Sequence, residues 1–108
     1  MSIPVDLADL QAEISRIGSS ALLVTATMQG PPHVASVLVT FEGPNLGMRV
    51  GRKTRANASE RPVVTLVWPA AVDPRYCLIV DAVVDDDPGE PLVVRPTSAV
   101  FHRLTAAS

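Results

Sequence analysis

The sequence predicts a mainly β domain, a small antiparallel barrel of six to seven strands with an N-terminal helix and one short helix between the third and fourth strands. The 108-residue chain contains sixteen valines, and β-branched side chains favour strands. Its ten prolines divide it into short elements. Closure into a barrel removes the exposed edges of such short strands, and the length suits one domain over residues 1–108.

Composition excludes several classes of protein and of site. A net charge of −2 argues against binding to nucleic acid or to an anionic membrane. One cysteine and two histidines are too few for an internal disulfide or for a zinc site, so we expect no metal. The apolar runs are far shorter than the ~20 residues that cross a bilayer. Because Met1–Ala12 also lacks the apolar centre of a signal peptide, we expect a cytoplasmic protein.

The first elements follow from hydrophobic spacing. Apolar residues recur at three- and four-residue steps over Leu7–Ile17, which predicts a helix with Asp6 as its N-cap and Gly18 at its end. Ala21–Thr27 and His33–Phe41 are then expected as two strands, joined in a hairpin by a Gly-Pro-Pro turn.

Alternating apolar residues and turn signals predict the remaining strands, which are Asn45–Val50, Val63–Trp68, Tyr76–Asp85, Leu92–Arg95 and Ser98–Leu104. Pro96 separates the last two, and Asp85–Pro91 is expected to be a solvated turn. Both faces of Tyr76–Asp85 are largely apolar, so this strand should be covered on both sides. We therefore expect a homodimer, in which a second subunit covers the outer face.

The most distinctive segment is Arg49–Pro62, which holds five of the nine basic residues. Thr54 is placed to cap a short helix that runs to about Arg61. Free N–H groups and the dipole at a helix start favour an anion, so this segment is a candidate phosphate site. The other interpretation is a surface helix whose arginines are only solvated, and the residues alone leave both open.

No residue pattern predicts a catalytic side chain. The chain has no Gly-x-Ser-x-Gly motif, no Gly-rich phosphate loop and no dinucleotide-binding glycine motif. His33 and His102 lack partners at a useful spacing and are expected to be structural. Any chemistry would therefore belong to a bound cofactor.

The order of segments resembles the pyridoxamine 5′-phosphate oxidase-like family of flavin- and deazaflavin-binding split barrels. The resemblance covers roughly residues 7–84 and rests on the leading helix, on Gly30-Pro31-Pro32-His33-Val34-Ala35-Ser36-Val37-Leu38-Val39, and on the Gly51–Pro62 helix entering Val63-Val64-Thr65-Leu66-Val67-Trp68. It implies a split β-barrel homodimer with two cofactor sites at the subunit interface, each for FMN or the deazaflavin F420. Some members bind haem instead.

Carried over to this chain, the resemblance places the cofactor ring near β-strand residues and its phosphate near the short helix. The residues that it implies are Ser36, Val37 and Leu38 at the ring, Val50 and Gly51 through their backbone, Arg52, Lys53 and Thr54 at the phosphate, and Asn57 at the ribityl or phosphate end. Ala35 and Thr40 stand where the true oxidases carry an arginine and a lysine. Two functions follow as hypotheses. One is a flavin- or deazaflavin-dependent oxidoreductase of unknown substrate, and the other is a non-catalytic barrel dimer that binds flavin or haem or serves as a structural module.

Overall fold

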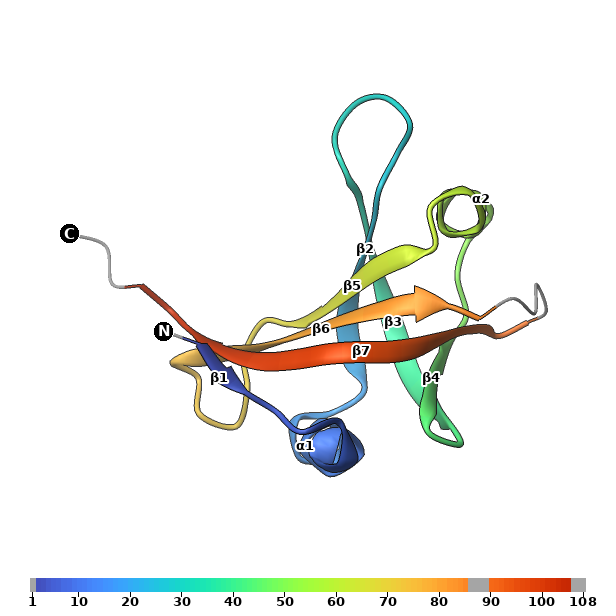
Figure 1. The fold of residues 1–108 in the computed structure, drawn as a ribbon. Helices are drawn as coiled ribbons and strands as arrows, with labels where there is room; N and C mark the ends of the chain where they lie inside the picture. The colour runs from blue at the N-terminus through green and yellow to red at the C-terminus, as the bar shows by residue number, and fades with distance from the viewer. Residues whose placement is uncertain (1, 86–89, 106–108) are drawn as a thin grey trace.

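Six strands close into an antiparallel barrel, and a short seventh strand pairs outside it (Figure 1). In this computed structural model, which describes residues 2–85 and 90–105, the closed order is β7-β4-β3-β2-β5-β6, and β6 pairs with β7 to complete the ring. The extra strand, β1, pairs antiparallel with β7. The predicted fold class is confirmed.

The helices and strands follow one another along the chain with short connections. Their bounds are β1 Ser2–Pro4, a 3-10 helix Leu7–Asp9, α1 Leu10–Ile17, β2 Ser20–Thr25, β3 His33–Glu42, β4 Asn45–Met48, α2 Arg52–Glu60, β5 Val63–Trp68, β6 Tyr76–Val84 and β7 Leu92–Arg103. The predicted hairpin is confirmed, since β2 pairs with β3 from Ser20 opposite Leu38 to Thr25 opposite His33. Its connecting loop projects beyond the barrel (Figure 1).

The N-terminal helix has the predicted ends but a different first turn. Asp6 accepts a hydrogen bond from the Ala8 N–H, and the turn that it caps is a 3-10 helix leading into α1. Gly18 ends α1 with φ 122°, a backbone conformation that glycine adopts without a steric penalty. Leu10 and Ile14 are buried under the barrel.

Two predictions about the strands are wrong at the C-terminal end. Leu92–Arg95 and Ser98–Leu104 are expected as separate strands, but they form one strand, β7, that runs through Pro96. The register shifts beside Pro96, because Asp81 pairs with Ser98 and Ala82 with Pro96. Such a bulge accommodates a proline, which has no N–H for the ladder. Strand β1 is not predicted from the sequence, and β4 ends at Met48 before the expected Val50.

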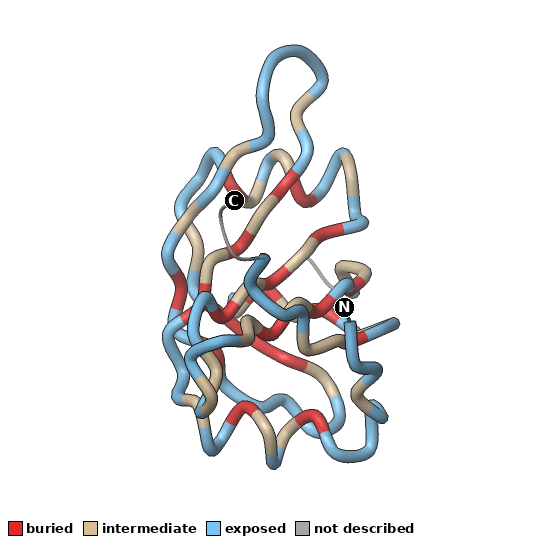
Figure 2. The backbone as a smooth tube through the Cα atoms, turned by 90° about the vertical axis from the view of Figure 1, so that its left-hand side faces the viewer, coloured by how far each residue is buried: buried red, intermediate tan, exposed pale blue. Residues whose placement is uncertain are grey.

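The core fills the barrel with the inward side chains of every closed strand. Figure 2 shows buried positions alternating with exposed ones along the strands. On β6, Leu78 and Val80 are buried while Ile79 and Val83 on the outer face are only half-buried. Trp68 is buried and donates from Nε1 to the Gly18 carbonyl at 2.9 Å.

Neither helix in the described residues is long and apolar enough to cross a membrane. Of the expected turn Asp85–Pro91, residues 86–89 lie outside the described part of the chain.

Candidate functional site

The outer side of β3 borders a groove on the surface of the barrel. This groove has a volume of about 600 Å³ and is lined by Ser36, Val37, Leu38, Thr40, Glu42, Met48, Arg49, Glu90 and Pro91. A smaller cavity of about 330 Å³ lies against the same three strand residues and is completed by Ser20, Ala21, Leu22 and Pro69. The three residues expected at a cofactor ring, Ser36, Val37 and Leu38, therefore line both cavities.

Strand alternation produces this arrangement. Val37 and Val39 point into the core and are 5% exposed, so the residues between and beside them face outwards. Leu38 is 67% exposed, which is unusual for a leucine in the middle of a ten-residue strand. Leu38 therefore presents an exposed apolar side chain where the two cavities meet.

The groove carries charges of both signs. Arg49, the residue after the end of β4, contributes a guanidinium group, while Glu42 and Glu90 contribute carboxylates. Glu90 forms an ion pair with Arg55 of α2, with Oε1 and Nη2 2.5 Å apart. This pair ties the first turns of α2 to one edge of the groove.

Helix α2 starts three residues earlier than predicted. Its N-cap is Gly51, with no side-chain capping bond, and the hydrogen-bond ladder begins from the Arg55 N–H to the Gly51 carbonyl at 3.0 Å. The first N–H groups of a helix have no partner within it, and no acidic side chain lies in the first turn of α2. Arg52 and Lys53 are exposed there, so the start of α2 is a locally positive surface.

The expected role of Thr54 as N-cap is wrong, because Thr54 is the third residue of α2 and is only 3% exposed. Its hydroxyl lies 3.1 Å from Nε2 of His33 on β3. One turn later, Asn57 donates from Nδ2 to the buried hydroxyl of Thr25 on β2 at 3.4 Å. Thr54 and Asn57 thus anchor α2 to the hairpin, a link that sequence reasoning misses.

The nine expected site residues fall into three groups in the structure. Ser36, Val37 and Leu38 line the groove; Val50, Gly51, Arg52 and Lys53 form the connection and the exposed helix start; Thr54 and Asn57 bond to the barrel. Sequence reasoning did not assign Thr40, Glu42, Met48, Arg49, Glu90 or Pro91 to the groove. Alternation along β3 could have indicated Thr40 and Glu42. Met48 is a core residue and Arg49 follows the end of β4, so alternation does not indicate them. Glu90 and Pro91 reach the groove through the pairing of β7 with β4.

The fold and the groove together define a closed β-barrel with a surface cleft beside one strand and a basic helix start near it. No family model matches the chain, and no curated protein matches it. A solved structure titled "F420 Reductase" has a TM-score of 0.64 against this chain, covering 80% of it and 94% of that structure, with 19% sequence identity. At this identity the likeness shows a shared fold.

Proposed function

We propose that the chain is a flavin- or deazaflavin-dependent oxidoreductase that binds its cofactor in the groove beside β3. The observation that carries this proposal is that the chain passes from the lining of the groove to the start of α2 within three residues. Arg49 lines the groove, and only Val50 and Gly51 separate it from Arg52 and Lys53. The fold shared with an F420 reductase supports a deazaflavin as the first cofactor to test.

The side chains of the groove suit a flat ring with an anionic tail. Its volume of about 600 Å³ lies within the range of small-molecule sites, roughly 300–1,000 Å³. Leu38 and Pro91 offer apolar contacts that exclude water from a ring, and Ser36 and Thr40 offer hydroxyl groups along its edge. When bound, the cofactor supplies the hydride or electron transfer.

The basic residues would hold the phosphate end. Lys53 and Arg52 present positive charges beside the free N–H groups of the first turn of α2, and both features favour an anion. His33 and Thr25 hold this turn against the barrel through Thr54 and Asn57. In this proposal these four residues position the helix, and they do not touch the phosphate.

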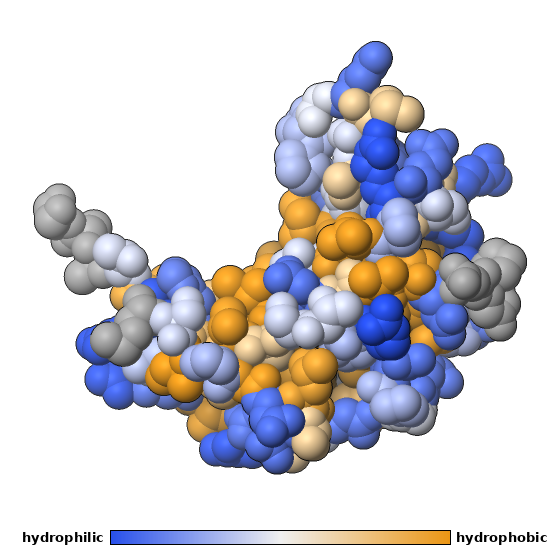
Figure 3. Space-filling view, in the orientation of Figure 1, coloured by the Kyte–Doolittle hydropathy of each residue, from blue (hydrophilic) through white to orange (hydrophobic). Residues whose placement is uncertain are grey.

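We further propose that two copies of the chain form a homodimer through the outer face of the sheet. On this face Val63 is 66% exposed, and Leu22, Val24, Val67 and Ile79 are half-buried. Figure 3 shows apolar surface gathered over β5 and β6. The molecule measures 38 × 34 Å across its two longer axes, which leaves room for the roughly 800 Å² per partner that a stable interface needs.

A second candidate function is a non-catalytic barrel that binds another ligand or none. It is favoured by one observation: none of the residues that line the groove beside β3 is aromatic. Extended planar rings commonly stack on aromatic side chains. Ala35 and Thr40 also provide no positive charge on β3.

Titration of the purified protein with F420, FMN and haem separates the two functions. The oxidoreductase proposal predicts quenching of F420 or FMN fluorescence at micromolar protein concentration. Absence of binding by both would refute it. Binding of haem alone would support the second candidate.

A further inference from the structure

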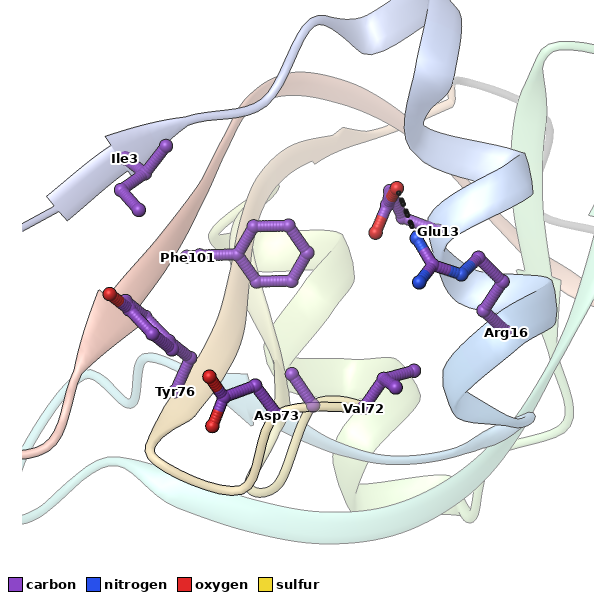
Figure 4. A pocket seen from close by; sticks show the side chains of 8 residues that line it. Ile3, Glu13, Arg16, Val72, Asp73, Tyr76 and Phe101 are labelled. Carbon is purple, nitrogen blue, oxygen red and sulfur yellow. Dashed lines mark hydrogen bonds and ion pairs between the residues drawn. The ribbon is translucent and has the colours of Figure 1, made fainter.

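The few aromatic side chains of this chain are unevenly distributed. It has four in total, and Trp68 is buried in the core. Two of the other three, Tyr76 and Phe101, line a separate cavity of about 290 Å³, which has no lining residue in common with the groove beside β3 (Figure 4). A ligand that needs an aromatic contact would find it in this cavity, which we call the aromatic cavity.

Four parts of the fold converge on the aromatic cavity. Phe101 lies on β7 directly opposite Ile3 of β1, and Tyr76 is the first residue of β6. Val72 and Asp73 come from the loop between β5 and β6, which is held by the hydrogen bond from the Ala71 N–H to the Tyr76 carbonyl at 2.9 Å. Helix α1 closes the remaining side with Glu13 and Arg16.

Two carboxylates face this cavity from different elements. Glu13 pairs with Arg16 at 3.2 Å, but Arg16 is 61% exposed, and such surface pairs are weak. Asp73 accepts hydrogen bonds from Arg75, which hold the pKa of its carboxyl at about 2, so it stays ionised at neutral pH. Arg75 does not line the cavity. The pair with Arg75 offsets the charge of Asp73. Glu13, whose pair with Arg16 is weak, is therefore the carboxylate that a cationic ligand would contact.

Figure 4 shows the Phe101 ring near the middle of the cavity, with Glu13 on one side and Asp73 on another. Ile3 and Val72 flank the ring and supply apolar contacts. The faces of aromatic rings attract cations, and an ammonium group bonds strongly to a carboxylate. A volume of about 290 Å³ suits a ligand with a single ring.

We propose that the aromatic cavity binds a small aromatic amine. The ring of the ligand packs against Phe101 and Tyr76, and its ammonium group donates to the carboxylate of Glu13. An aromatic carboxylate of the same size is disfavoured by the negative charge of Glu13. This site is independent of the proposed cofactor groove and of the proposed dimer.

Titration of the ¹⁵N-labelled full chain with 2-phenylethylamine, followed by amide chemical shifts, tests the proposal. We expect saturable shifts at Ile3, Val72 and Phe101, and at least tenfold weaker binding of 3-phenylpropionate. Equal affinity for the two compounds would overturn the proposal. Absence of shifts with the amine, or shifts confined to residues outside the cavity, would overturn it as well.

Variants test whether the amine binds in the aromatic cavity. Val72 is 60% exposed in a loop, so Val72→Arg should leave the fold intact while placing a cation beside the ring; we expect amine affinity to fall at least tenfold. Ala26→Arg makes the same change of charge at an exposed position after β2 and should leave the affinity unchanged. Glu13→Gln should reduce the preference for the amine over the neutral 2-phenylethanol. Equal losses in Val72→Arg and Ala26→Arg, or an unchanged preference in Glu13→Gln, would count against the site.

Discussion

Nε2 of His33 lies 3.1 Å from the Thr54 hydroxyl, and this contact joins the first residue of β3 to the first turn of α2. Three residues after His33, the same strand begins to line the groove at Ser36. The strand that would contact a cofactor ring and the helix that would hold its phosphate are thus linked by the half-buried His33 and the buried Thr54.

Replacement of Thr54 by valine should destabilise the protein. The variant keeps the shape of the side chain but leaves the His33 ring without its partner in a half-buried place, a loss of about 1–3 kcal/mol. Chemical denaturation measures the change in the free energy of unfolding. Ser59→Ala, at an exposed position of α2, is the matched control and should change little. Equal stability of Thr54→Val and the wild type would show that the contact contributes nothing.

Lys53→Ala should weaken cofactor binding with little effect on folding. Lys53 is exposed at the start of α2, and a hydrogen bond to a charged group contributes about 1.5–3 kcal/mol. Fluorescence titration with whichever of F420 and FMN binds gives the affinity. Arg103→Ala, an exposed cation at the end of β7, serves as control. An unchanged affinity in Lys53→Ala would place the phosphate elsewhere.

Light scattering should give about twice the 11.4 kDa of one chain if the outer face pairs two copies. Val63→Asp places a charge within the apolar outer face and should shift the protein to monomer, because burying an unpaired charge is costly. Val72→Asp, on a loop elsewhere and similarly exposed, should stay dimeric. A wild type that stays monomeric at all concentrations tested would contradict the dimer.

The Asp73 carboxyl should titrate far below its ordinary value of 3.8. Side-chain and backbone hydrogen bonds from Arg75 lower its pKa to about 2 in the folded state. Because the folded pKa is the lower one, the stabilisation by this pair is present above about pH 4 and is lost as the pH falls through about 2. Carbon NMR of the Asp73 carboxyl group as a function of pH measures the midpoint of its titration. Arg75→Ala should raise it towards 3.8, and a wild-type midpoint already near 3.8 would contradict the geometry.

Local patterns predicted most of the fold, because the barrel strands alternate regularly between core and surface. Val63–Trp68 is a strand over its whole predicted range, and the hairpin of β2 and β3 follows from its turn residues. The errors lie where long-range pairing decides the structure. Ser2–Pro4 becomes a strand because β7 offers an edge 98 residues away, and Pro96 is tolerated because a bulge absorbs it. The local sequence shows neither the pairing of β1 with β7 nor the bulge between β6 and β7.

Only part of the candidate site follows from the sequence. The family resemblance implied Ser36 and Leu38 at a cofactor ring, and alternation along β3 places both side chains on the outer face, where they line the groove. Capping preference suggested Thr54 as a helix start, but the His33 ring recruits its hydroxyl to the barrel. Glu90 borders the groove only because β7 pairs with β4, which brings residues some 40 positions apart together. A sequence shows which residues can form such contacts and does not show which of them meet.

The amide chemical-shift map of the protein bound to F420 or FMN tests the central claim most directly. The account predicts that the shifts gather at Ser36, Leu38 and Arg49 and at the first turn of α2 around Lys53. Shifts confined to other residues, such as Tyr76 and Phe101 in the aromatic cavity, or the absence of shifts with both cofactors, would contradict a cofactor site beside β3.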